Sequence, residues 1–341
     1  MLNTVYRLVA PGRIEVEFSD IDLLKEDVLV RPTHLSICHA DQRYFQGLRA
    51  TDILKQKLPM ALIHEAIGEI VWDPKGAFEA GERVVMIPNT PMEEDSVIAE
   101  NYLRTSKFRA SGFDGFMQDV VNMRRDRIVR VPRNINPFVA AFTELVSVSV
   151  HAIDRFDKIA HERRKTVGIW GDGNLGYITA IFFKAMFPEV KLCIFGLDEN
   201  KLSDFTFADD TFSITSIPDD LSIDHAFECV GGEGSPKAIN QIIDYINPEG
   251  TISILGVSEN PVAINTRMIL EKGLRMFGSS RSGRKDFEKT IALYQSNPEI
   301  VEYLQNIIGA TVNVHTVEDM KKAFELDRQN AFGKTIMIWN K

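Results

Sequence analysis

The pattern of apolar and polar residues changes once along the chain, near residue 145. Before that point, short β-rich pieces alternate with Gly, Pro and Asp, as at residues 13–18, 27–32, 66–72 and 83–88. A polar stretch at 89–115 interrupts them, and we expect it to be loop-rich with a single helical turn. Residues 1–145 are therefore predicted to form a β-rich domain.

After residue 145, short apolar segments alternate with segments of helical periodicity. This pattern predicts strands at 165–171, 190–196, 224–232, 250–257 and 274–280, and helices at 174–187 and 236–246. Strands that alternate with helices form parallel sheets covered on both faces. The tail adds an amphipathic helix at 317–327 and a strand at 334–340. We therefore predict an α/β nucleotide-binding domain, 146–282, inserted into a catalytic domain made of 1–145 and 283–341.

Composition narrows the classes of protein that this chain can belong to. A net charge of −9 over 341 residues argues against a general nucleic-acid surface. Cys38, Cys193 and Cys229 cannot form a disulfide framework, which suits a reducing compartment. The first residues lack the features of a signal peptide, and no apolar run is long enough to span a membrane. A cytoplasmic enzyme or ligand-binding protein is expected.

The segment "GDGNLG" places Gly171, Gly173 and Gly176 between a predicted strand and a predicted helix. Glycines at this spacing allow a tight turn, the close approach of a pyrophosphate to the backbone, and close packing of helix on sheet. The helix that begins with Asn174 and Leu175 presents free N–H groups to phosphates. A structural turn without a ligand is the alternative interpretation.

The end of the second strand indicates which dinucleotide is bound. An acidic residue about 20 positions after the last glycine usually holds the ribose 2′-OH of NAD, and here Gly196 occupies that place. Glycine leaves room for a 2′-phosphate, and Lys201 is available to neutralise it. We therefore expect NADP(H), although Asp198 offers an alternative carboxylate for NAD.

Four side chains of the first 145 residues together suggest a zinc site. Taken singly, Cys38 reads as a buried thiol, His64 and Glu65 as a surface pair, and Glu144 as a helix cap. Together they offer a thiolate, an imidazole and two carboxylates, with Glu144 as a fourth or alternating ligand. Neighbouring strand residues point to opposite faces, so the backbone must turn near residue 64 for both to bind one ion. Asp41 suits a supporting role beside an imidazole, or a turn cap.

These motifs, in this order, resemble the zinc-dependent medium-chain dehydrogenase/reductase family over essentially the whole chain. The family's C-x-x-D is "CHAD" (38–41), its G-H-E appears as "IHE" (63–65), and "ELVSVSVHA" (144–152) resembles its sorbitol-type branch. The resemblance implies a GroES-like catalytic domain split around a Rossmann domain, one catalytic zinc, and a dimer or tetramer.

Within the family, segments such as "LPMALIHE" and "GSSRSGRKDF" are similar to the ribitol-5-phosphate dehydrogenases of teichoic acid synthesis. That similarity implies reduction of D-ribulose 5-phosphate with NADPH, and a cytidylyltransferase that makes CDP-ribitol from the product. The rival interpretations are an NAD-dependent sorbitol or xylitol dehydrogenase, and a regulatory nucleotide-binding protein with an inactive metal site.

The chain departs from the family pattern at two places. Residues 89–115 contain no cysteine, so the structural zinc of many members should be absent. Ala40 stands where the family often has the Ser or Thr that relays a proton, which leaves His39, Tyr44 or a chain of water molecules as alternatives.

A sugar phosphate requires positive side chains within this acidic protein. Arg43, Tyr44 and Arg284 are the candidates for substrate binding, and Arg281 and Lys334 are candidates for contact with the cofactor phosphates. His151 is a candidate cleft residue, whereas Cys193 and Cys229 are expected to be packing thiols.

Overall fold

The computed structural model describes residues 1–330 and 332–341, and its chain forms two compact units. Unit 1 comprises Met1–Ser147 and Ser282–Lys341, and unit 2 comprises Val148–Arg281. Helix α4 (Thr143–Ile159) carries the chain from the first unit into the second. Each unit has its own sheets and core, so each is described separately.

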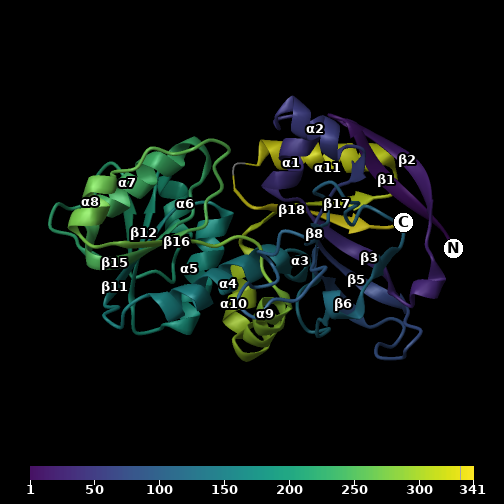
Figure 1. The fold of residues 1–341 in the computed structure, drawn as a ribbon, viewed down its shortest axis with the longest axis horizontal. Coiled ribbons are helices and arrows are strands. Elements are labelled where there is room, and N and C mark those ends of the chain that lie inside the picture. Colours follow the sequence, from purple (N-terminus) through teal and green to yellow (C-terminus); the bar gives the residue numbers. More distant parts are fainter. Residues whose placement is uncertain (331) are drawn as a thin grey trace. The chain divides into compact units, whose positions relative to one another are not determined.

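Unit 1 is built on a seven-stranded sheet with the order β10-β6-β5-β3-β18-β17, in which β9 also pairs with β3. Its strands are β3 (Val28–Ser36), β5 (Glu65–Trp72), β6 (Arg83–Met86), β9 (Val121–Met123), β10 (Ile128–Arg130), β17 (Ile308–Val314) and β18 (Lys334–Trp339). Strand β18 runs antiparallel to β3, with Met337 opposite Leu35. The last strands of the chain therefore complete a sheet whose first strand along the chain is β3 (Figure 1).

Smaller elements of unit 1 surround this sheet. A second sheet has the order β2-β1-β4. It comprises β1 (Leu2–Ala10), β2 (Arg13–Asp20) and β4 (Met60–Ala61), while β7 (Asn89–Thr90) pairs with β8 (Lys107–Phe108). The helices are η1 (Leu23–Lys25), α1 (His39–Phe45), α2 (Thr51–Lys57), η2 (Arg125–Arg127), α3 (Pro137–Ala141), α9 (Arg284–Ser296), α10 (Pro298–Gln305) and α11 (Val317–Gln329).

Helix α11 fixes the position of α1, which follows Cys38. Its buried residues Met320, Ala323 and Phe324 recur at helical spacing and form one apolar face. Phe324 stacks on Phe45 of α1 with ring centroids 4.4 Å apart. Gln42 of α1 donates a hydrogen bond to the Phe324 carbonyl at 2.6 Å. The start of α1 is therefore held by apolar packing and by a buried hydrogen bond.

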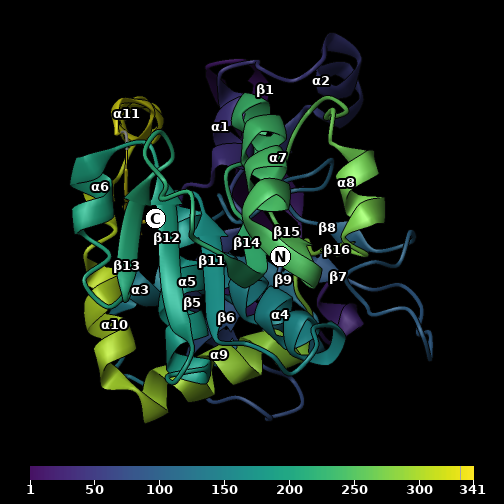
Figure 2. The same cartoon turned by 90° about the vertical axis from the view of Figure 1, so that its left-hand side faces the viewer.

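Unit 2 is a six-stranded parallel sheet with the order β13-β12-β11-β14-β15-β16. In chain order its elements are β11 (Thr166–Trp170), α5 (Asn174–Met186), β12 (Lys191–Gly196), α6 (Glu199–Ser203), β13 (Asp210–Ser213), β14 (Ile223–Glu228), η3 (Gly232–Gly234), α7 (Ser235–Tyr245), β15 (Ile246–Ile254), α8 (Thr266–Glu271) and β16 (Arg275–Gly278). The chain order reverses between β11 and β14, and such a switch point is where open α/β sheets bind ligands. Right-handed crossovers in the two directions place α5 and α7 on opposite faces (Figure 2).

The predicted α/β fold with a parallel sheet is confirmed, and two local predictions are corrected. Residues 89–115 contain the strands β7 and β8 in place of the expected helical turn. Residues 39–45 form helix α1, which the apolar pattern did not predict because the segment is short. Among the described helices, we find none that is both long and apolar enough to cross a membrane.

Candidate active site

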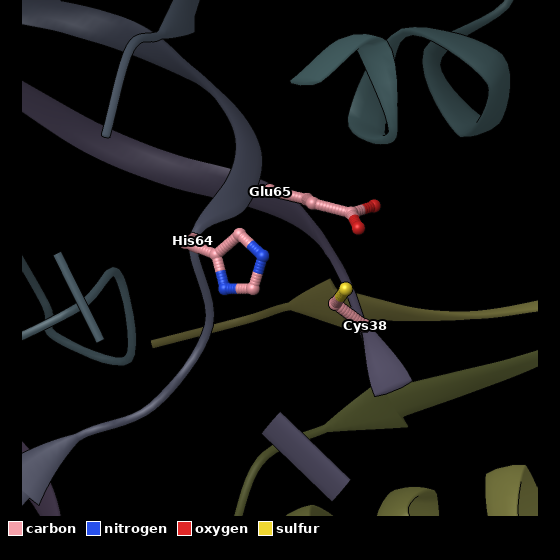
Figure 3. Close-up of side chains that lie close together, drawn as sticks. All are labelled: Cys38, His64 and Glu65. Atoms are coloured by element: carbon pink, nitrogen blue, oxygen red, sulfur yellow. The ribbon is translucent and has the colours of Figure 1, made fainter. Parts of the chain in front are cut away.

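Three side chains of unit 1 bring their donor atoms together, one each from Cys38, His64 and Glu65. These atoms all lie within 4.8 Å of one another. Cys38 precedes the first residue of α1, and Glu65 is the first residue of β5. Figure 3 shows the sulfur, the imidazole and the carboxylate facing a common space. The structure therefore joins three of the four expected zinc ligands.

A turn of the backbone at Ile63 lets the neighbouring residues His64 and Glu65 face the same space. Ile63 has φ 71°, a left-handed conformation that β-branched residues rarely adopt. Its N–H donates to Asp41 Oδ1 at 3.0 Å, and its carbonyl accepts from the Phe116 N–H at 2.8 Å. The surrounding structure thus holds a strained residue in place where the site requires a turn.

Asp41 orients the imidazole of His64 as well as the backbone around it. Its Oδ2 lies 3.3 Å from His64 Nδ1 and also accepts a hydrogen bond from the Cys38 N–H at 3.3 Å. Because Asp41 lies at Nδ1, the other ring nitrogen, Nε2, is left for the cluster. A carboxylate behind a ligand histidine is the usual way of fixing its ring in metal sites.

Lys334, the first residue of β18, lies against Glu65 with its Nζ 2.9 Å from each carboxylate oxygen. Both residues are buried, and the pair joins positions 269 residues apart. Burial lowers the pKa of the Lys334 ammonium, but Glu65 and Cys38 outweigh this and raise it. Lys334 therefore partners Glu65, and its assignment to the cofactor phosphates is not supported.

One feature of the sequence indicated that Lys334 has a buried partner. Lys334 opens a mostly apolar strand, "KTIMIW", where a charged residue needs a buried partner. The sequence could not name that partner, because only the pairing of β18 with β3 brings Lys334 toward β5.

Glu144 is not part of the group of three but shares its electrostatic environment. It lies in the first turn of α4 and is buried. Burial, with a smaller contribution from Glu65, raises the pKa of its carboxyl to about 7, while His64 acts in the opposite direction. Near neutral pH this carboxyl can therefore hold or release a proton.

The donor set fits a zinc ion. A thiolate, an imidazole and a carboxylate are usual zinc ligands, and bonds of about 2.0–2.3 Å require only a small closure of the group. Burial raises the pKa of the Cys38 thiol, with His64 opposing this effect. Burial would lower the pKa of His64, but Asp41 and Cys38 raise it well above its ordinary value. The cluster thus favours a positive charge at its centre, which a divalent cation would supply.

In unit 2, the three glycines of "GDGNLG" have three different surroundings. Gly171 has φ 128°, and a Cβ there would lie 2.9 Å from the backbone of Cys229. A Cβ on Gly176 would lie 1.9 Å from the Gly171 carbonyl oxygen. Around Gly173, which precedes α5, a Cβ would meet no described atom within 4 Å. Open space at the start of α5, beside the partly exposed Asn174 and Leu175, fits the approach of a pyrophosphate.

The space beside Gly196, at the end of β12, is occupied by Asp172. A Cβ at Gly196 would lie 2.7 Å from both Cβ and Oδ2 of Asp172. The structure therefore places a carboxylate beside Gly196, where the sequence suggested that none would be. Asp198 Oδ1 accepts hydrogen bonds from the N–H groups of Asn200 and Lys201, at 2.9 and 3.4 Å, so it caps α6.

Two of the expected substrate residues have other partners in unit 1. Tyr44 is buried in the hydrophobic core with the Arg49 guanidinium 4.9 Å from its ring centroid. Arg284 donates to Glu288 at 2.8 Å and to the Ile128 carbonyl at 3.1 Å. Their assignment to the substrate is therefore not supported.

Arg43, the third candidate for substrate binding, lies in α1. It is partly exposed, and His39, at the first position of the same helix, is exposed. Partial burial of the ring, and then the charge of Arg43, lower the pKa of His39, so the two side chains are neighbours. A positive side chain therefore lies on the helix that begins at Cys38.

The other predicted residues are placed in unit 2. Lys201 is partly exposed on α6, and Arg281 is exposed with φ 58°. His151 is buried in α4. Burial raises the pKa of Cys193 to about 11 and that of Cys229 further, as expected for packing thiols.

Family models match both parts of the chain. An alcohol dehydrogenase GroES-like domain matches residues 24–133, and a zinc-binding dehydrogenase domain matches residues 203–296. The chain belongs to the zinc-dependent medium-chain dehydrogenase/reductase family.

Relatives named for their activity indicate which members of the family this chain is similar to. The chain is 55% identical to ribulose-5-phosphate reductase 2 of Staphylococcus aureus, over 99% of both chains. It is 52% identical to the ribulose-5-phosphate reductase of Bacillus spizizenii, again over 99% of both. A crystal structure of S. aureus TarJ in complex with NADPH covers 100% of both chains, with 50% identity and a TM-score of 0.90.

Proposed function

We propose that this protein is a zinc-dependent reductase that converts D-ribulose 5-phosphate into D-ribitol 5-phosphate with NADPH. The observation that carries the proposal is the cluster of Cys38, His64 and Glu65 in a chain whose relatives at 52–55% identity are ribulose-5-phosphate reductases. The family and the donor set support zinc-dependent reduction of a carbonyl. The choice of substrate rests on the activity named for the relatives. The NADPH complex of TarJ supports the choice of cofactor.

Each residue of the cluster has a defined task in this proposal. Zinc, when bound, acts as a Lewis acid that polarises the C2 carbonyl of the substrate. Cys38, His64 and Glu65 would hold the ion, with Glu144 as a fourth or alternating ligand. Asp41 keeps the His64 ring in orientation, and Lys334 balances the charge of Glu65.

The product alcohol requires a proton, and the usual hydroxyl relay is absent at Ala40. Of the two side chains expected to replace it, Tyr44 is buried in the core, whereas His39 is exposed beside Cys38. His39 is therefore the stronger candidate for supplying this proton. Arg43, one helical turn further along α1, is the candidate for the substrate phosphate.

The dinucleotide is assigned to the glycine-rich turn of unit 2. The α5 N-terminus, with open space around Gly173, would bind the pyrophosphate, and Lys201 is the candidate cation for a 2′-phosphate. The nicotinamide supplies the hydride, and the protein contributes binding and orientation. Arg281 is retained as a candidate for contact with the cofactor phosphates.

The proposal also covers the oligomeric state of the protein, its location and the enzyme that uses its product. We expect a cytoplasmic homo-oligomer, a dimer or tetramer, whose product is consumed by a cytidylyltransferase that makes CDP-ribitol for teichoic acid. Light scattering of the purified protein measures the oligomeric state. Co-purification with the cytidylyltransferase tests for a stable complex.

The proposal is tested by NADPH oxidation with the zinc-loaded protein. We expect turnover with D-ribulose 5-phosphate and little or none with unphosphorylated D-ribulose at the same concentration. Arg43→Ala should raise KM for the sugar phosphate and leave the Kd for NADPH unchanged. Faster oxidation of sorbitol or xylitol with NAD would instead identify a polyol dehydrogenase. NADPH binding without zinc or turnover would identify a regulatory protein.

A further inference from the structure

Asp172, the second residue of the glycine-rich turn, places its carboxylate at the end of β12. Asp172 Oδ2 accepts hydrogen bonds from the backbone N–H groups of Leu197 at 2.7 Å and Asp198 at 2.9 Å. These bonds join the first βα turn of unit 2 to the turn that follows its second strand. Within the part of the chain that the structure describes, both bonds go to Oδ2, so Oδ1 is left for a ligand.

This is the place where a Rossmann unit distinguishes its dinucleotides. The residue at the end of the second strand usually carries the carboxylate that accepts the ribose 2′-OH of NAD. Here that residue is Gly196, and a Cβ on it would lie 2.7 Å from Asp172 Oδ2. Glycine at 196 therefore makes room for a carboxylate that comes from the glycine-rich turn instead of from the strand.

The other nearby carboxylate, Asp198, caps α6 and is not among the nearest atoms that a Cβ on Gly196 would meet. Asp198 Oδ1 accepts hydrogen bonds from Asn200 and Lys201 at the start of α6. Leu197, which lies between Gly196 and Asp198, is 70% exposed and carries no charge. Asp172 is therefore the carboxylate that the turn after β12 positions at the expected ribose site.

We propose that Asp172 is a specificity-determining residue of the dinucleotide site, which accepts the ribose 2′-OH of NADH and opposes the 2′-phosphate of NADPH. The inference rests on the proposed assignment of a dinucleotide to unit 2. It predicts that the protein binds NADH as well as NADPH, with Lys201 as the cation that favours the phosphorylated cofactor.

The sharpest test is Asp172→Asn, which keeps a carbonyl oxygen for the two backbone N–H groups and removes the negative charge. A hydrogen bond to a charged group contributes about 1.5–3 kcal/mol, so NADH should bind at least about tenfold more weakly. NADPH should bind more tightly because a repelling charge is lost. Both Kd values are measured by titrating the fluorescence of the reduced nicotinamide, without any substrate.

Asp198→Asn is the matched control, because it removes a neighbouring carboxylate that caps α6 and does not occupy the space beside Gly196. We expect its ratio of NADH to NADPH affinity to equal that of the unmodified protein. An unchanged ratio in a folded Asp172→Asn protein would overturn the role of Asp172. So would an unmodified protein that binds NADPH but shows no measurable NADH binding. Failure to bind either nucleotide would overturn the dinucleotide assignment itself, whereas failure to reduce ribulose 5-phosphate would leave these titrations valid.

Discussion

Ile63 shows how a single residue shapes the metal cluster. The family motif G-H-E has a glycine where this chain has Ile63, and the left-handed φ of 71° explains why glycine suits the position. The side chain of Ile63 is completely buried in the core of unit 1. This chain therefore combines apolar packing with backbone strain immediately before His64.

Replacing Ile63 by alanine and by glycine should separate these two effects. Alanine loses the packing and keeps the strain, at a cost of about 2–5 kcal/mol. Glycine loses the Cβ as well but relieves about 1–2 kcal/mol of left-handed strain. We expect Ile63→Gly to be at least as stable as Ile63→Ala in urea denaturation. At Ile67, a buried residue of β5 outside the positive-φ positions, glycine should be the less stable replacement. If glycine were also the less stable replacement at position 63, the proposed backbone strain at Ile63 would be contradicted.

Thiol chemistry should distinguish Cys38 from the other two cysteines. Cys193 and Cys229 are buried in unit 2, and burial raises the pKa of both thiols. If Cys38 holds zinc, a chelator should make it the one cysteine that iodoacetamide modifies in the folded protein. Mass spectrometry of the labelled peptides measures this. Cys38→Ser should lose bound zinc and turnover, and equal labelling of Cys38 with and without chelator would count against the site.

At the scale of elements, Glu100 ties the 89–115 segment to the rest of unit 1. Its carboxylate accepts from Arg127 at 2.8 Å and from the backbone N–H of Arg284, the first residue of α9, at 2.7 Å. Arg127 is buried and also donates to the Asn89 carbonyl at 3.3 Å. These bonds hold a segment in which many family members are expected to carry a structural zinc.

Glu100→Ala should therefore destabilise unit 1 without disturbing the metal cluster. Loss of hydrogen bonds to a charged, buried Arg127 costs about 2 kcal/mol. We expect a lower denaturation midpoint with unchanged bound zinc. Glu94→Ala, at an exposed position of the same segment, is the control and should leave the midpoint unchanged. A loss of zinc in Glu100→Ala would show that the segment also supports the cluster.

At the scale of the whole molecule, the buried His225 should make folding stability depend on pH. Its Nδ1 accepts from the Thr251 N–H, and its Nε2 lies 3.1 Å from the Arg163 carbonyl, so the neutral ring fits both partners. Burial, with a contribution from His161, lowers the pKa of His225 to about 4. The unfolded chain, with an ordinary histidine pKa near 6.5, binds this proton more readily than the folded protein. Stability should therefore fall as pH decreases from about 6.5 to about 4.

The slope that His225 contributes is at most about 1.4 kcal/mol per pH unit. Urea denaturation at several pH values measures it. His225→Gln should flatten this part of the curve, whereas replacement of the exposed His315 by Gln should not. An unchanged pH dependence in His225→Gln would show that other groups account for it.

Local patterns by themselves determined the α/β class, the strand–turn–helix around Gly171 and the residue types of a zinc site. They could do so because hydrophobic periodicity and turn geometry depend on residues close in sequence. Helix α1 escaped prediction because so short a segment shows little periodicity.

The tertiary structure alone decided which side chains meet. It set Lys334 against Glu65, filled the space at Gly196 with Asp172, buried Tyr44 and gave Arg284 other partners. The physical reason is that ion pairs and buried contacts form between residues that strand pairing and helix packing bring together. Lys334 and Glu65 are 269 positions apart, and no local pattern encodes such a meeting.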